Sequence, residues 1–352
     1  MSNAIDNLVE CLGLSSVKKR LMRDMRDIYY FYVDAQTRQR IGKMGWFRRT
    51  VHRFHYLFKS LLRKLSPGRR ILLIIALVLQ FMQVRINQSG VVIENRGFLL
   101  LLLILILELK DKLLAKDELR IGHSVQSALL PASSPDIPGW DIYLISKPAN
   151  DVGGDLVDLI SDRGRHGAVL ADVAGKGLGA ALLSAKLQST LRALFPHFAK
   201  PAQLCKEVNV ILCRDGLPSR FISMFYVEFD STHGRVHYIN AGHFPALFIS
   251  NRNIQETEKG EPALGLNPAT DYRLHQIDCQ SGDVLFLYSD GLTEGRNDQN
   301  EFWSQERLLK WLAAHPGLNA AETATGLLAE VKAFSGDEPQ SDDISLLILR
   351  RL

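Results

Sequence analysis

The stretch 149–177 constrains this chain most, because two short apolar runs in it each border an aspartate that lies beside glycines. Asp155 follows two glycines and begins the first run, whereas Asp172 ends the second run and precedes a glycine-rich turn. A Ser-Asp-Arg-Gly turn separates the runs, which predicts a hairpin with both carboxylates near one end of a sheet. Glycines let the backbone approach an ion closely, and carboxylates suit a hard divalent cation. The alternative is that Asp172 only forms a turn or caps the next helix.

The C-terminal third repeats this arrangement. Asp290 follows an apolar strand predicted at 283–288 and precedes a glycine, and Asp342 and Asp343 come directly before a final strand at 344–349. Acidic residues recurring at strand ends in the company of glycine are hard to explain by turns alone. They favour a cation site assembled from distant parts of the chain.

Taken in order, five motifs resemble the bacterial metal-dependent protein serine/threonine phosphatases, in the branch of stress-response and sporulation regulators related to the PP2C-type enzymes. The resemblance covers roughly residues 117–352, and it is specific because the whole set occurs in the right order. It implies an α+β fold of two stacked antiparallel β-sheets flanked by helices. The motifs are Val152-Gly153-Gly154-Asp155, Asp172-Val173-Ala174-Gly175-Lys176-Gly177, Asn240-Ala241-Gly242-His243, Tyr288-Ser289-Asp290-Gly291 and Asp342-Asp343-Ile344.

The same resemblance implies a role for each carboxylate. Asp172 is expected to bridge two divalent cations, Mn²⁺ or Mg²⁺, and the Val173 carbonyl oxygen to bind one of them. Asp290 and Asp342 would complete the site, and Asp155 would bind directly or through a water molecule. Two such ions can activate water for in-line attack on phosphorus, so no protein nucleophile is needed.

Two neighbouring residues are expected to assist. Asp343 is predicted to support the site, and Lys176 either neutralises phosphate charge or is merely solvated. Eukaryotic relatives carry a histidine just after the bridging aspartate, whereas this chain has Ala174-Gly175-Lys176 there.

The resemblance implies hydrolysis of a phosphoserine or phosphothreonine on a regulatory protein, for example an antagonist of an anti-sigma factor. The alternative is a non-catalytic, membrane-tethered scaffold that keeps the fold and binds phosphoproteins. The presence of all four carboxylates favours the enzyme.

Charge is distributed unevenly. Residues 1–70 hold 16 Lys/Arg and 5 Asp/Glu, whereas the remaining residues hold 26 and 33. The spacing of apolar and basic residues at 46–65 predicts an amphipathic helix that suits an anionic membrane surface. The alternative is a helix that packs on the rest of the protein. Nucleic-acid binding would rest on charge alone and is not expected.

Two apolar runs, 71–84 and 97–107, contain no charged residue, and basic residues flank their outer ends. Each is shorter than the ~20 residues that normally span a bilayer. We expect a membrane hairpin of two helices at 71–108, with membrane contact through 46–108. The alternative is a soluble helical sensor or dimerisation core. The expected location is the inner membrane with the phosphatase domain in the cytoplasm, or otherwise the cytoplasm.

The sequence thus predicts an all-α N-terminal region and one phosphatase domain. Residues 1–70 form a basic helical region, 71–108 the membrane hairpin, 109–131 a connector helix and 132–352 the phosphatase domain. In the family resembled, the connector often forms a dimer, so we expect a homodimer. Within the domain, the pattern predicts strands at 140–146, 221–230, 234–240, 246–250 and 272–278, besides those above, and helices at 180–194, 201–213, 304–314 and 320–334.

Overall fold

The structure is a computed structural model. It describes residues 65–81, 84–87, 90–93, 96–216, 220–230, 233–251 and 253–352, with single positions between 40 and 62. The chain forms two compact units, Met1–Leu114 and Ala115–Leu352. The helix predicted at 46–65 lies mostly outside the described residues.

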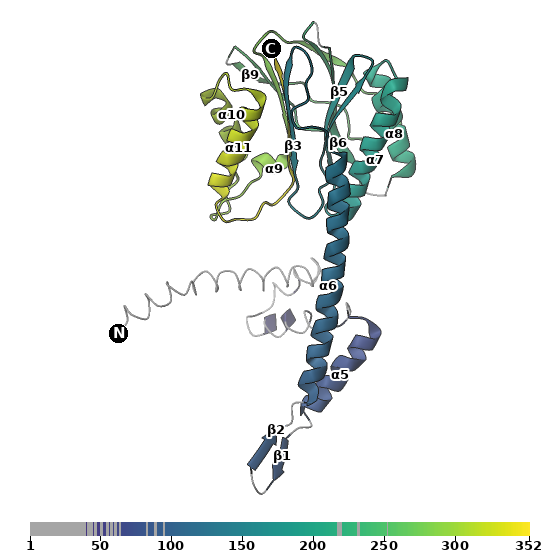
Figure 1. The fold of residues 1–352 in the computed structure, drawn as a ribbon, viewed down its shortest axis with the longest axis vertical. Coiled ribbons are helices and arrows are strands. Elements are labelled where there is room, and N and C mark those ends of the chain that lie inside the picture. Colours follow the sequence, from purple (N-terminus) through teal and green to yellow (C-terminus); the bar gives the residue numbers. More distant parts are fainter. Residues whose placement is uncertain are drawn as a thin grey trace, which may run out of the picture. The chain divides into compact units, whose positions relative to one another are not determined.

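From Pro67 onward, the described residues of the N-terminal unit form a helix, a β-hairpin and the first part of a second, longer helix. Helix α5 (Pro67–Phe81) leads into strands β1 (Val84–Asn87) and β2 (Gly90–Ile93), and helix α6 (Arg96–Leu129) follows (Figure 1). Arg69 ties the two helices together, because its guanidinium pairs with Glu108 at 2.7 Å and with Asp111 at 2.6 Å. The region is therefore helical as predicted, but the expected all-α region also contains this hairpin.

The membrane hairpin predicted at 71–108 is not found. α5 has 15 residues, and the apolar run that opens α6 soon gives way to charged residues. Across the part of the chain that the structure describes, none of the helices is both long and apolar enough to cross a bilayer.

The C-terminal unit is built on two five-stranded antiparallel sheets. The first has the strand order β10-β7-β6-β5-β4. Helices α7 (Leu178–Leu194) and α8 (Pro201–Asp215) cover its outer face (Figure 1). Its strands are β4 (Leu156–Asp162), β5 (Arg165–Val173), β6 (Ile222–Phe229), β7 (Arg235–Ala241) and β10 (His275–Asp278).

The second sheet has the strand order β3-β12-β11-β8-β9. Helices α10 (Ser304–Ala314) and α11 (Ala320–Ser335) cover its outer face, and the short helix α9 (Asp290–Thr293) follows β11 (Figure 1). Its strands are β3 (Trp140–Lys147), β8 (Leu247–Ser250), β9 (Asn253–Glu256), β11 (Val284–Tyr288) and β12 (Ile344–Arg351). The two strands that supply the C-terminal aspartates, β11 and β12, are direct neighbours.

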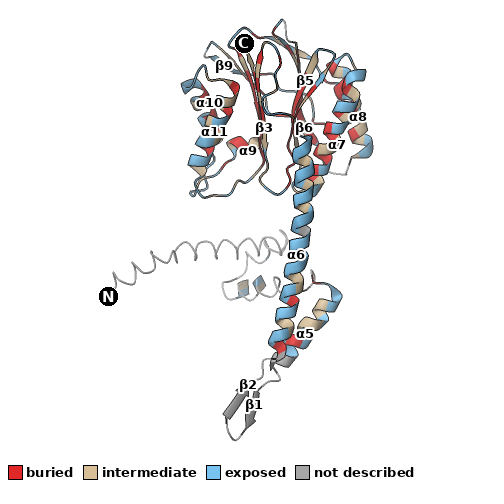
Figure 2. Cartoon of the chain, viewed as in Figure 1, coloured by how far each residue is buried: buried red, intermediate tan, exposed pale blue. Residues whose placement is uncertain are grey.

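Three apolar layers hold the domain together. One lies between α7, α8 and the first sheet, one between the sheets, and one between the second sheet and α10 with α11. Strands that bury both faces need nearly continuous apolar runs, as in the Ile344–Leu349 part of β12. Figure 2 shows this burial concentrated on the inner faces of the layers. The predicted fold class, two antiparallel sheets flanked by helices, is confirmed.

The end of α6 packs on the two-sheet unit beside the first aspartate motif. The Gln126 side chain donates to the Gly153 carbonyl at 2.9 Å and accepts from the Gly153 amide at 3.1 Å. Gln188 and Arg192 of α7 donate to the Leu129 carbonyl at 2.9 and 3.2 Å. These contacts satisfy the last carbonyl of α6, which would otherwise lack a partner.

Candidate active site

The first sheet brings two of the predicted aspartates to the same end of two neighbouring strands. Leu156 at the start of β4 pairs with Ala171 near the end of β5, so Asp155 and Asp172 come at the same end of these strands. The hairpin predicted from the sequence is therefore confirmed, and it places the two carboxylates side by side.

The second sheet does the same with the C-terminal motifs. Tyr288 at the end of β11 pairs with Leu346 near the start of β12, which leaves Asp290 and Asp342 beyond the same edge. The backbones approach closely here, because a Cβ on Gly291 would lie 2.0 Å from the Asp343 carbonyl oxygen. Only glycine fits at this position, which explains the Asp-Gly pair after β11.

Asp343 links the strand ends of the two sheets through hydrogen bonds. Its Oδ1 accepts a hydrogen bond from the Ala149 amide at 2.8 Å, and its Oδ2 accepts one from the Gly154 amide at 2.6 Å. The residue precedes β12 of the second sheet, while its partners belong to the segment that leads into β4 of the first sheet. A carboxylate from one sheet thus fixes the Asp155 loop of the other.

Asp155 is a buried carboxylate, and one of its two oxygens lacks a hydrogen-bond partner. It is 5% exposed, and its Oδ2 has no hydrogen-bond partner. Burial raises the pKa of Asp155 well above its usual range, and the charges of Asp172 and Asp343 raise it further. The nearby Ser345 and Ser289 hydroxyls lower this pKa only in part. A buried anion in this state is costly unless a cation faces it.

Asp172 and Asp290 belong to the same electrostatic cluster. Burial raises the pKa of Asp172 to about 6, with the charges of Asp290, Asp342 and Asp343 contributing. Burial also raises the pKa of Asp290, and the negative charge of Asp342 raises it further. Carboxylates from both sheets therefore repel one another across the gap between the two edges.

The remaining predicted residues lie beside this cluster. Lys176 forms an ion pair with Asp342, with 2.7 Å between Nζ and Oδ2, and it donates to the Ser341 carbonyl at 2.8 Å. The Val173 carbonyl oxygen faces Gly154 and would lie 3.4 Å from a Cβ there. The structure thus brings Asp155, Asp172, Val173, Lys176, Asp290, Asp342 and Asp343 into one region.

These residues fit divalent cations by chemistry, though not as a closed ligand set. No three His, Cys, Asp or Glu side chains in the described ranges converge tightly enough to hold an ion by themselves. The donors are nonetheless the hard oxygens that Mg²⁺ and Mn²⁺ prefer, and Mg²⁺ usually keeps several water ligands. The unpartnered Asp155 Oδ2 and the mutual repulsion of the carboxylates are what a cation would relieve.

Sequence reasoning missed one cation at this site. Arg220 precedes β6, and its Nη1 donates to the Ala174 carbonyl at 3.4 Å. Its guanidinium occupies space that a Cβ on Gly175 would enter, at 2.6 Å, and Gly175 has a φ of +114°. No described carboxylate pairs with Arg220, whereas Lys176 is already bound to Asp342. No local motif marks this arginine, because its neighbours come from a segment 46 residues earlier.

Comparison with known proteins agrees with this geometry. The family model described as "Stage II sporulation protein E (SpoIIE)" matches residues 162–352. The phosphoserine phosphatase RsbU of Bacillus subtilis (strain 168) is 30% identical over 238 residues, which are 67% of this chain and 70% of RsbU. The chain belongs to the SpoIIE family. Protein IcfG of Synechocystis is 28% identical over 66% of this chain, and the match spans 41% of IcfG.

Solved structures show the same fold. The SiaA-PP2C domain of Pseudomonas aeruginosa superposes with a TM-score of 0.60 at 21% identity, covering 68% of this chain and 98% of that domain. The PP2C phosphatase domain of SpoIIE from Bacillus subtilis, solved with a fragment of its regulatory domain, gives a TM-score of 0.52 at 17% identity, over 62% of this chain and 64% of that one. The predictions of a PP2C-like fold and of a phosphoprotein phosphatase acting on serine or threonine are confirmed.

Proposed function

We propose that this SpoIIE-family phosphatase is metal-dependent and removes phosphate from a phosphoserine or phosphothreonine on a regulatory protein. The observation that carries the proposal is the meeting of Asp155 and Asp172 from one sheet with Asp290 and Asp342 from the other. Four acidic side chains without enough protein cations to balance them favour a site for external cations.

The proposed ligands are Asp155, Asp172, Asp290 and Asp342, with the Val173 carbonyl oxygen. Two divalent cations bound there, Mn²⁺ or Mg²⁺, would lower the pKa of a water molecule and stabilise charge on the phosphoryl oxygens. Asp172, in β5 of the first sheet, is close enough to Asp290 and Asp342 for their charges to raise its pKa, and it is the proposed shared ligand. Lys176 orients Asp342 through its ion pair, and Asp343 holds the Asp155 loop through two backbone amides.

Arg220 is the proposed contact for the substrate phosphate. It lies beside the loop that follows Asp172, and no described carboxylate competes for its guanidinium. A planar guanidinium can bind two phosphoryl oxygens at once, and Lys176 is occupied by Asp342. Arg220 would therefore orient the phosphate towards the carboxylate cluster.

The surface around the site suits a protein substrate. Leu178 and Leu182, one helical turn apart at the start of α7, are 50% and 63% exposed, and Phe221 next to Arg220 is 39% exposed. Apolar side chains gathered on a surface commonly mark a protein-binding site. RsbU is named a phosphoserine phosphatase. By analogy, we propose a phosphorylated regulator as the substrate, such as an antagonist of an anti-sigma factor.

The test is hydrolysis of p-nitrophenyl phosphate and of a phosphoserine peptide, with and without Mn²⁺ or Mg²⁺. We expect activity only with added ion, and a loss of about a thousandfold or more in Asp172→Asn. Activity that persists in excess chelator would contradict metal dependence. A well-folded protein that binds the phosphopeptide without hydrolysing it would instead support the scaffold alternative.

Membrane attachment through residues 46–108 and dimerisation through 109–131 are also proposals. Ile71, Ile74 and Leu99 in the N-terminal unit are each at least 58% exposed, and exposed large apolar side chains gathered in one unit commonly mark a membrane or protein contact. Membrane fractionation of the full chain against a chain starting at Lys116 tests the first proposal. Sedimentation of the same two proteins in detergent tests the second.

A further inference from the structure

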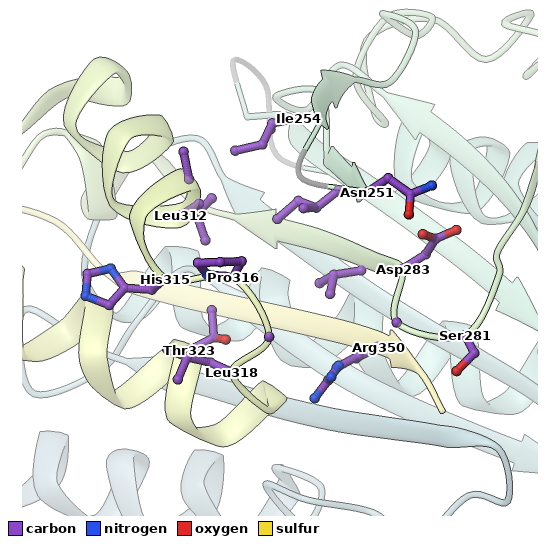
Figure 3. A pocket seen from close by; sticks show the side chains of 15 residues that line it. Asn251, Ile254, Ser281, Asp283, Leu312, His315, Pro316, Leu318, Thr323 and Arg350 are labelled. Carbon is purple, nitrogen blue, oxygen red and sulfur yellow. The ribbon is translucent and has the colours of Figure 1, made fainter.

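A cavity lies at the other end of the second sheet, far from the carboxylates. It has a volume of about 230 Å³ and opens between the end of β8, the start of β11 and the loop joining α10 to α11 (Figure 3). β11 begins at this cavity and ends beside Asp290. β12 begins at Ile344, directly after Asp343, and its Arg350 lies at the cavity. Because a strand rises about 3.3 Å per residue, the cavity lies on the order of 20 Å from the proposed metal site.

One side of the cavity is apolar and the other carries an unmatched cation. Ile249, Ile254 and Leu312 supply apolar surface, and Arg350 reaches in from β12 (Figure 3). Arg350 is half-buried, and no hydrogen bond or ion pair joins its guanidinium to any of the described residues. Its neighbour Arg351, by contrast, donates to the Gly139 carbonyl at 2.8 Å and stacks over Trp140. A partly buried guanidinium without a partner favours an anion from outside the protein.

The other ionisable groups of the cavity do not neutralise Arg350. Asp283 is buried, and its Oδ2 accepts from the Gln280 amide at 2.8 Å. Figure 3 shows its carboxylate on the Asn251 side and the Arg350 side chain on the Leu318 side. His315 pairs its Nδ1 with the Trp311 carbonyl at 2.9 Å and stacks on the Trp311 ring, so it faces α10.

We propose that this cavity binds a small organic anion, a carboxylate with a short apolar chain. The carboxylate oxygens bind Arg350, and the chain lies against Ile249, Ile254 and Leu312. A volume of about 230 Å³ equals that of roughly eight water molecules, which matches a ligand of about eight non-hydrogen atoms such as hexanoate. With the affinity per atom that is usual for small molecules, a ligand of this size should bind with a dissociation constant on the order of 10 mM.

The experiment compares three probes on the full chain by ligand-observed NMR: hexanoate, 1-hexanol and acetate. Hexanoate is expected to bind at least about tenfold more tightly than either of the others, because only hexanoate offers both charge and chain. Arg350→Gln should weaken hexanoate by about tenfold and bring it to the level of hexanol. Lys310→Gln is the matched control, since Lys310 carries the same charge on α10 and pairs with Glu306 outside the cavity.

Equal binding of hexanoate and hexanol, or of hexanoate by wild type and Arg350→Gln, would overturn the proposal. So would the absence of hexanoate binding to the wild type up to about 50 mM. If Arg350→Gln does not fold, Ile254→Thr on the edge strand β9 replaces it. That variant should weaken hexanoate by several-fold and leave acetate unchanged, and an unchanged hexanoate affinity would count against the site.

Discussion

Two buried aspartates three residues apart show how differently this domain treats a carboxylate. Asp158, within β4, is fully buried and receives two hydrogen bonds from Arg192 of α7, at 2.8 and 2.7 Å. Asp155, just before β4, is also buried but faces other carboxylates, and its Oδ2 has no partner. The Asp158–Arg192 pair holds α7 on the first sheet. The charge of Asp155 destabilises the folded protein when no cation faces it, which is the property expected of a site that receives cations.

The largest effect on stability is expected from breaking the matched pair. Arg192→Leu leaves the Asp158 carboxylate buried without a counter-charge, so it should lower the free energy of unfolding by about 3 kcal/mol. Chemical denaturation of the chelated protein measures this loss. The double variant Asp158→Asn with Arg192→Leu should recover part of it. A single variant as stable as the wild type would show that the pair is not needed.

Removing a charge from the carboxylate cluster should change the stability in the opposite direction. Asp172→Asn removes one of the repelling charges, and in chelator at pH 7 it should raise the free energy of unfolding by about 1–2 kcal/mol while abolishing activity. The pKa of Asp172 is about 6 in the folded protein, against the ordinary 3.8, so the folded state holds this proton to higher pH. The cost of the charge is therefore absent below about pH 3, and it grows as pH rises from the unfolded pKa of 3.8 to the folded pKa of about 6.

The difference between Asp172→Asn and wild type should accordingly shrink as pH falls from 6 to 4, and it should vanish below about pH 3, where the carboxyl group is protonated in both the folded and unfolded states. Thermal melts across pH 3 to 7 measure it. If Asp172→Asn is less stable than wild type at pH 7 in chelator, the carboxylates do not repel one another as described.

Arg220, like Asp155, has no oppositely charged partner among the described residues, and we expect it to bind the substrate phosphate. Arg220→Gln should raise KM for a phosphopeptide by about tenfold with a much smaller change in kcat, because the residue binds phosphate without holding the ions. Lys186→Gln is a suitable control, since Lys186 pairs with Asp215 on the exposed side of α7. A fall in kcat alone, with KM unchanged, would speak against phosphate binding by Arg220.

The smallest effect should come from Lys176. Its ion pair with Asp342 is largely exposed to solvent, and such pairs contribute little. Lys176→Met should change stability by less than about 0.5 kcal/mol and weaken Mn²⁺ binding by only about two- to threefold. A loss of activity as large as that of Asp172→Asn would instead give Lys176 a direct part in the reaction.

The sequence predicted the parts of this molecule that depend on local pattern. Period-two apolar runs and glycine turns located most of the strands, and aspartates at strand ends marked the edges that meet. It did not reveal the pairing of Asp158 with Arg192, because a contact across 34 residues leaves no local signature. The same holds for Arg220, which reaches the Asp172 loop only after β5 and β6 have paired.

The N-terminal region was harder to predict for a different reason. Strands β1 and β2 are rich in β-branched residues, which is a strand signal, but so short a segment between two apolar runs also fits a simple link between helices. The short apolar runs beside it fit either a membrane or a packed core, since periodicity alone does not separate the two.

The central claim is that the four aspartates from the two sheets hold divalent cations, and calorimetric titration of Mn²⁺ into the chelator-treated full chain tests it most directly. The wild type should bind close to two ions. Asp155→Asn and Asp172→Asn should weaken binding by at least about tenfold or abolish one site. Asp158→Asn, within β4 but paired with Arg192, should bind Mn²⁺ as the wild type does. Equal Mn²⁺ binding by wild type and Asp172→Asn would contradict the account.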